Sequence, residues 1–264
     1  MKKIVINKSH ITNNLLTIRE DAIIYLNDLG SISDLEINIL GCNVKIIDKS
    51  NLSKRIKLEN ANVDYFIITS DNFNNKFEMS VDNSEISVEV IDLLAKSTNL
   101  IINSDLVSRN SKMFLNTAVI SKGNNEKIYD LTINSLVGDT YSKIDNFGIA
   151  KDESKISFSD VSYIKKAAKN SEVYQDNKIL LLDEKAEGIN KPILIIDEND
   201  VKAGHGSSVG MIDKEVLFYL TSRGISLSDA RNLICLGKVS FMINKLEDET
   251  IKEKLIASFT EGVY

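Results

Sequence analysis

The sequence predicts a mostly β fold, because short apolar runs recur along most of the chain and turn-forming residues separate them. Runs such as Ile86–Val90 alternate apolar and polar side chains at the period of a half-buried strand. Asn, Asp, Ser and Gly lie between the runs, as at 82–84 and 123–125, where they favour turns. Only one proline, Pro192, is present to interrupt the hydrogen-bonded ladders.

The apolar runs before residue 197 fit a series of short strands. In chain order they are Ile4–Ile6, Ala22–Leu26, Leu35–Leu40, Val44–Ile47, Tyr65–Ile68, Ile86–Val90, Leu131–Ile133 and Ile179–Leu182. Many short strands joined by turns are typical of a sandwich, a barrel or a β-solenoid. Spacings of roughly 20 residues between comparable runs suit a solenoid. No exact repeat is visible, so the pattern alone leaves sandwich and solenoid equally favoured.

The last quarter of the chain predicts three helices. Asp213 can cap the first and Gly224 can end it. Ser226, with Asp229 three residues later, opens the second in the manner of a capping box, and Asp248 opens the third. The expected apolar stripes contain Ala230, Leu233, Ile234, Gly237 and Phe241 on the second helix, and Ile251, Leu255 and Phe259 on the third. We therefore divide the chain into a β core over 1–210 and a helical domain over 211–264.

Composition argues against several classes of function. The net charge of −6 and the interspersed charges argue against nucleic acid as a partner. No run of eighteen apolar residues could span a membrane, and the N-terminus does not read as a secretory signal, so we expect a cytoplasmic chain. Phosphate-binding glycine motifs are absent, and His10 and His205 are the only histidines. These features favour a non-enzymatic binding or scaffold protein.

One stretch of the chain carries a resemblance to a known family. Residues 197–210 read DENDVKAGHGSSVG and residues 213–225 read DKEVLFYLTSRGI, while 174–182 and 185–187 fit the coils just before them. This order resembles the SufB/SufD family of iron–sulfur cluster assembly proteins. The resemblance is dense over about 150–245 and faint before residue 129, and the chain is short for that family.

The resemblance implies a right-handed parallel β-helix followed by a small helical domain. It also implies a scaffold subunit of the SUF system, which pairs with a SufB- or SufD-like subunit or, for this short chain, with itself as a homodimer. The C-terminal helices would dock a SufC-like ABC ATPase. The residues that we expect to bind that partner are Asp213, Val216, Phe218, Tyr219, Arg223, Leu233 and Phe241.

His205 is the residue that the resemblance marks for metal chemistry. It matches a histidine at the subunit junction of the family, which makes it a candidate ligand of a transient iron–sulfur cluster, and a neutral imidazole suits iron. The alternative is a histidine that bonds to backbone at the corner between the β body and the helices. We expect glycines 204, 206 and 210 to permit that corner. Lys202 and Asp200 are expected to form an exposed ion pair.

The two cysteines predict little cluster chemistry. SufB-like members have a cysteine in the coil that reads 175–178 here, and a glutamate after the junction histidine, and this chain has neither. Cys235 is expected to be buried and structural, and Cys42 to be a free thiol near a turn. Two other functions therefore remain open: an interaction protein that keeps the fold without cluster chemistry, and a β-helical carbohydrate-active enzyme with paired carboxylates.

Overall fold

A computed structural model describes residues 1–30, 32 and 34–263, and its strands form two sheets. The odd sheet contains β1 (Lys2–Ile6), β3 (Ala22–Leu26), β5 (Asn43–Asp48), β7 (Asn62–Ile68), β9 (Glu85–Asp92), β11 (Lys112–Ser121), β13 (Tyr141–Ala150), β15 (Glu172–Leu181) and β17 (Lys202–Met211). The even sheet contains β2 (Leu15–Ile18), β4 (Asp34–Leu40), β6 (Ser53–Glu59), β8 (Asp71–Asp82), β10 (Ala95–Leu106), β12 (Glu126–Ser135), β14 (Lys155–Ile164) and β16 (Glu187–Ile196).

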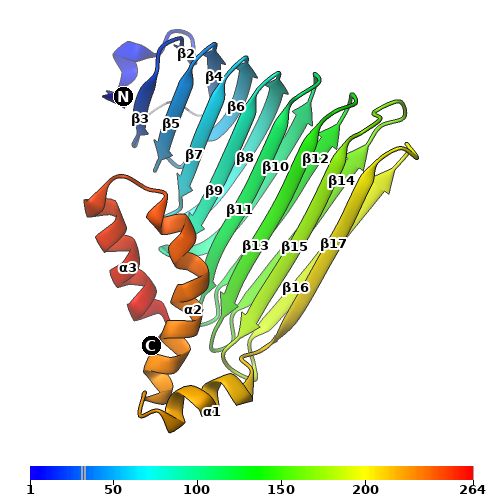
Figure 1. Ribbon diagram of the computed structural model, residues 1–264. Coiled ribbons are helices and arrows are strands. Elements are labelled where there is room, and N and C mark those ends of the chain that lie inside the picture. The colour runs from blue at the N-terminus through cyan, green and yellow to red at the C-terminus, as the bar shows by residue number, and fades with distance from the viewer. Residues whose placement is uncertain (31, 33, 264) are drawn as a thin grey trace.

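Every strand pair in both sheets is parallel, and the strands alternate between the sheets along the chain. Each coil therefore adds one strand to each sheet, and the coils stack into a parallel β-helix (Figure 1). Within β11–β13, for example, Lys112 pairs with Tyr141 and Ser121 with Ala150 without a break in register. The β-solenoid that the family resemblance implies is confirmed, and the sandwich is wrong.

The core lies between the two sheets and is filled by every second side chain of each strand. Ile37 and Ile39 of β4 and Val88 of β9 have no measurable exposure. Paired residues of parallel strands lie on the same face, so inward side chains stack in rows from coil to coil. In one such row, Leu115 of β11 lies next to Ile144 of β13.

Turns between the coils use residues that tolerate positive φ. Asn60 and Asn83, one coil apart, have φ values of 52° and 42°. The side-chain amide of Asn83 donates to Asn60 Oδ1 at 2.6 Å. Three coils later the Asn170 side chain donates to Asp139 Oδ1 at 3.0 Å in the same way. Asn and Asp adopt this left-handed conformation more readily than other non-glycine residues, which explains their frequency between the strands.

A fully buried ion pair lies at one edge of the core. Lys127 Nζ is 2.7 Å from Asp92 Oδ1, and neither side chain is exposed. Asp92 also accepts hydrogen bonds from the hydroxyls of Thr69 at 2.6 Å and Tyr129. Burial lowers the pKa of Lys127, an effect that the neighbouring carboxylate opposes. A second such pair, Lys54 with Asp48 at 2.9 Å, lies nearer the N-terminus.

The C-terminal segment forms helices α1 (Lys214–Ser222), α2 (Leu227–Asn244) and α3 (Glu249–Val263). Asp213 caps α1 by accepting from the amide of Glu215, and Ser226 caps α2 by accepting from the amide of Asp229. Gly224 has a φ of 88° just after α1. The three helix starts and the stop after α1 are thus confirmed.

Helices α2 and α3 cover part of the outer face of the odd sheet (Figure 1). Their buried side chains form one apolar cluster with outward side chains of that sheet, which includes Ile47, Phe66, Ile91, Ile149, Leu180, Cys235, Val239, Ile243, Leu255 and Phe259. The third-helix stripe of Ile251, Leu255 and Phe259 is buried as expected. The second-helix stripe is only partly right, because Leu233 and Phe241 point to solvent.

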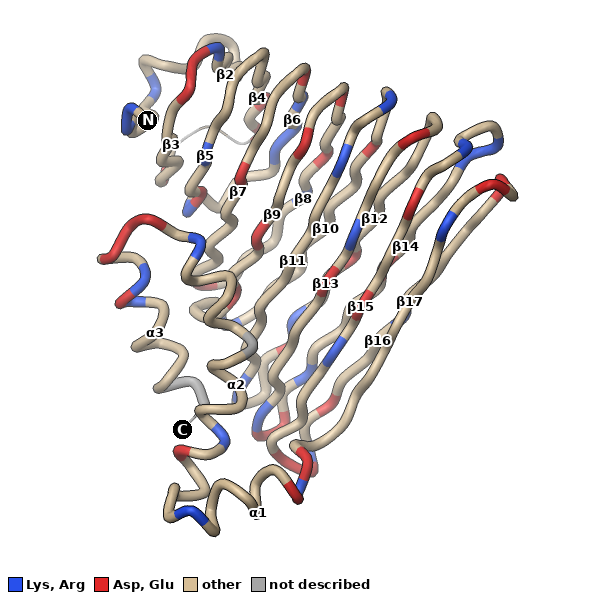
Figure 2. Tube along the Cα trace, viewed as in Figure 1, with Lys and Arg blue, Asp and Glu red and all other residues tan. Residues whose placement is uncertain are grey.

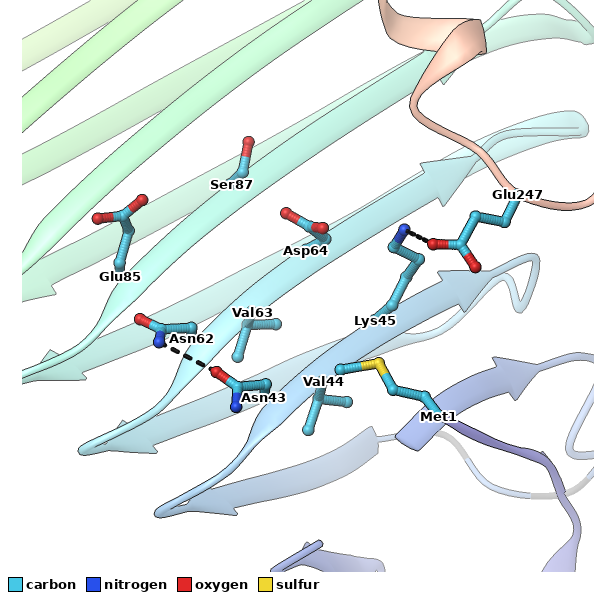
Figure 3. A pocket seen from close by; sticks show the side chains of 10 residues that line it. All are labelled: Met1, Asn43, Val44, Lys45, Asn62, Val63, Asp64, Glu85, Ser87 and Glu247. Carbon is cyan, nitrogen blue, oxygen red and sulfur yellow. Dashed lines mark hydrogen bonds and ion pairs between the residues drawn. The ribbon is translucent and has the colours of Figure 1, made fainter. Parts of the chain in front are cut away.

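Two ion pairs fix the corner between α2 and α3 to the sheet. Lys245 bonds to Glu89, which is 1% exposed, and Lys45 Nζ lies 2.6 Å from Glu247. Figure 3 shows the Lys45–Glu247 pair at one side of a shallow polar hollow, with Asp64 and Glu85 farther along the same face. No helix among the described residues is long and apolar enough to cross a membrane.

Candidate functional site

The two ends of the solenoid differ in the length and the side chains of their terminal strands. At the N-terminal end, β1 and β2 have only five and four residues, and Lys2 and Lys3 lie on the edge strand. Short edge strands with lysines discourage pairing with other sheets. At the C-terminal end, β16 and β17 are ten residues each, and both are last in their sheets. Their exposed large apolar residues are Ile193, Ile195, Ile196, Val209 and Met211.

His205 lies in the middle of β17, at the C-terminal end of the solenoid, which we call the open end because no further coil among the described residues covers β16 and β17. It pairs in register with Gln175 of β15, and so continues the inward row of Leu115 and Ile144. The ring is nevertheless exposed, since β17 is the last strand of its sheet. The expected corner at this position is wrong, because residues 202–211 are a regular strand whose backbone is paired to β15 along its whole length.

Two expectations around His205 are also wrong. Gly204, Gly206 and Gly210 are strand residues without positive φ, so no turn requires them. They lie on the outer face of β17, where a Cβ on Gly206 would approach Asp176 Oδ1 to 3.2 Å. Lys202 pairs with Glu172 at 2.7 Å on the neighbouring strand instead of with Asp200, because strand register places Lys202 directly opposite Glu172.

Polar side chains fill the core beneath the C-terminal end of the solenoid, and they were not predicted from the sequence. Gln175 is 2% exposed and donates to Ser162 Oγ at 2.8 Å and to the Ile193 carbonyl at 3.2 Å. Asn146 donates to both carboxylate oxygens of Asp160, at 3.1 and 2.9 Å. Alternating polar positions within strands were the available signal, but a strand has two faces and the sequence does not show which one is inward.

Asp160 has an unusual proton affinity for a carboxyl group. Its side chain has no measurable exposure, and this burial raises its pKa to about 7, against the opposing effect of the Asn177 and Asn146 amides. A pKa of about 7 makes both protonation states accessible near neutral pH.

Metal-binding residues do not converge within the described part of this chain: no group of three or more His, Cys, Asp or Glu is found there. Cys235 is buried on α2, where burial raises its pKa to about 12. Cys42 is also buried, as a free cysteine beside the turn at Gly41. The expectation for Cys235 is confirmed, and His205 is left as the exposed candidate ligand at the open end.

The predicted partner-binding residues of the helical domain lie at the surface. No residue of α1 is buried, and Phe218 is 74% exposed beside exposed Val216 and Tyr219. Arg223 lies over the Tyr219 ring at 5.3 Å, and Asp213 is the helix cap. On α2, Leu233 and Phe241 are 55% and 67% exposed. Exposed apolar side chains thus gather on α1 and on one face of α2.

Charge does not gather into one patch around these sites. Figure 2 shows lysine and arginine interspersed with aspartate and glutamate along the coils and on the helices. Several of these charges are paired across neighbouring strands, as in Lys112–Glu85 at 3.3 Å and Lys57–Glu36 at 2.8 Å. Positive and negative charges are thus mixed over the whole solenoid surface. The C-terminal end and the helices differ from the rest of the surface by their exposed apolar side chains.

Comparison with known proteins identifies the family. The family model "SUF system FeS cluster assembly, SufBD core domain" matches residues 49–238, so the likeness reaches much farther back than residue 129. The iron-sulfur cluster assembly protein SufD of Bacillus subtilis is 27% identical over 95% of this chain and 57% of its own length. SufD of Escherichia coli is 35% identical over 41% of this chain and 26% of its own length.

An iron-sulfur cluster assembly SufBD family protein of Mycobacterium leprae is 36% identical over 34% of this chain and 24% of its own length. The chain thus spans little more than half of the Bacillus relative and about a quarter of the other two. The family model nevertheless covers well over half of the chain, and it includes the last coils, α1 and most of α2. The chain belongs to the SufB/SufD family of iron–sulfur cluster assembly proteins.

Proposed function

We propose that this chain is a non-enzymatic scaffold subunit of a SUF-type complex and that its C-terminal helices dock a SufC-type ATPase. The exposure of α1 is the observation that supports docking. This nine-residue helix has no buried residue, and its Val216, Phe218 and Tyr219 are exposed. Helices of this length gain most of their stability from packing an apolar face. A partner that covers α1 supplies that packing.

The open end of the solenoid supports a second part of the proposal. Two ten-residue edge strands with exposed apolar side chains suit pairing with another β-helix, either a SufB- or SufD-like subunit or a second copy of this chain. His205 would then lie at the joint between the subunits. We propose that it supplies one ligand to an iron–sulfur cluster carried as cargo, with the other ligands from the joined subunit.

The proposed ATPase-docking helix α1 and the proposed subunit interface at β17 lie at different places on the chain. This separation leads to a proposal for how ATP is used. Closure of two docked ATPases would pull on the helices, and α2 and α3 are packed on the same sheet that ends in β17. A change in the joint would draw its energy from contacts that differ between the two ATPase states. None of these events requires the chain itself to hydrolyse a bond.

Affinity capture tests the assembly. A tag on the full chain should retain a co-expressed SufC-type ATPase together with either a SufB-type subunit or an untagged copy of the chain. Recovery of the tagged chain alone would contradict the proposal. Deletion of residues 213–264 is a poor variant for this purpose, because it would uncover the apolar outer face of the odd sheet.

Anaerobic reconstitution with iron and sulfide separates cluster carriage from simple docking. The assembled complex should acquire the absorption of an iron–sulfur cluster. A complex that forms but never shows this absorption would instead support an interaction protein that keeps the fold without cluster chemistry.

A further inference from the structure

The junction between the solenoid and the helical domain contains a small cavity of about 130 Å³. Its lining residues come from the ends of β15 and β17 and from α1 and α2: Leu181, Leu182, Met211, Ile212, Lys214, Leu217 and Arg231. An apolar cavity of about 150 Å³ accommodates a benzene-sized group. This cavity therefore has room for one apolar side chain.

Two cations lie at this apolar cavity without carboxylate partners. Neither Lys214 nor Arg231 forms an ion pair with any residue that the structure describes. Lys214 is the first residue of α1, where the helix dipole disfavours a positive charge, so its own helix gains nothing from it. Elsewhere in the chain several lysines at the surface are paired, as Lys202 is with Glu172.

Helix α1 contributes both to the cavity and to the exposed apolar surface. Leu217 lines it, and the next two residues, Phe218 and Tyr219, are exposed. Met211 is 51% exposed at its wall, and the flexible, polarisable methionine side chain adapts well to a bound partner. A partner that covers α1 thus meets the cavity and its two cations together.

We infer that this cavity is an anchor site for a segment of the docked ATPase that presents an apolar side chain beside a carboxylate. The inference rests on the proposed function and adds the chemistry of the contact. The apolar side chain fills the cavity between Leu182 and Leu217, and the carboxylate pairs with Lys214 and Arg231. Charge pairs at such sites set orientation and association rate as well as affinity.

Calorimetric titration of the full chain with the SufC-type ATPase tests the inference. The double variant Lys214→Glu, Arg231→Glu should weaken binding roughly tenfold or more. The matched control Lys254→Glu reverses an exposed lysine of α3 that does not line the cavity, and it should bind like wild type. The conservative variant Lys214→Arg, Arg231→Lys should keep most of the affinity, which excludes misfolding as the cause.

The outcomes separate the two proposals. If the wild-type chain binds and the charge-reversed variant binds equally well, the anchor site is wrong and docking through α1 stands. If the wild-type chain does not bind the ATPase, both are wrong. Loss of self-association in the charge-reversed variant, measured by sedimentation, would assign the cavity to a second copy of the chain and would also overturn the inference.

Discussion

His205 and Gln175 occupy paired positions on β17 and β15, on the sheet face that points into the core in the preceding coils. Gln175 is 2% exposed, whereas His205 is exposed. One step along the stack thus turns a core position into a surface position, because β17 is last in its sheet. A subunit that pairs with β17 would bury the imidazole at the joint.

Replacement of His205 by alanine should separate cargo binding from folding. The free energy of unfolding should change by less than about 0.5 kcal/mol, because the ring is exposed. Iron retained after anaerobic reconstitution of the complex should fall. His10→Ala is the matched control, since His10 lies at the opposite end of the solenoid. Equal iron in wild type and His205→Ala would remove His205 as a ligand.

Asp160→Asn should change how stability depends on pH. The folded carboxyl, with a pKa of about 7, keeps a proton that the unfolded carboxyl, at 3.8, releases. Stability of the wild type should therefore fall by about 1.4 kcal/mol for each pH unit between these values, and level off above them. The variant should lack this slope and be the more stable protein at pH 8, as measured by urea unfolding.

Asp176→Asn is the control for that titration, because Asp176 is exposed on the outer face of the adjacent β15. It should show the wild-type pH profile. The same slope in Asp160→Asn as in the wild type would show that Asp160 does not hold a proton in the folded core.

Lys127→Met should be among the most destabilising single changes in the solenoid. It leaves the fully buried Asp92 carboxylate without its cation, which costs about 3–5 kcal/mol. Lys143→Met breaks a half-exposed pair with Asp145 and should cost about 1 kcal/mol or less. Chemical denaturation of the two variants makes the comparison, and equal costs would contradict the account of a buried, charge-dependent core.

Phe218→Ala should weaken ATPase binding and leave stability nearly unchanged, because the ring is 74% exposed. Phe259→Ala, at a position on the buried face of α3 that is 1% exposed, should instead cost about 3–5 kcal/mol of stability. Titration calorimetry and thermal unfolding of both variants are needed. A Phe218→Ala variant that binds like wild type would move the docking face away from α1.

Local signals in the sequence predicted the helical domain well. Asp213, Ser226 and Asp248 mark helix starts because capping depends on residues only two or three positions away. Leu233 and Phe241 belong to the expected apolar stripe of the second helix and also to the expected partner-binding residues, and both are exposed. Helical period alone does not say which apolar residues meet the sheet.

The solenoid depends on contacts that the sequence does not show locally. Each strand pairs with one a coil away, as Tyr141 does with Glu172, and the spacing varies because the turns differ in length. The pairing of Lys202 with Glu172 and the buried row of Asn146 and Asn177 follow from that register. Only the family resemblance could favour the solenoid over the sandwich before the structure was known.

Complex formation with the SufC-type ATPase is the most direct test of the proposed role. Size-exclusion chromatography with light scattering should show the full chain and the ATPase eluting together, with a mass equal to a whole-number combination of both. Separate elution of two unassociated proteins at micromolar concentration, with the chain folded, would contradict the scaffold role.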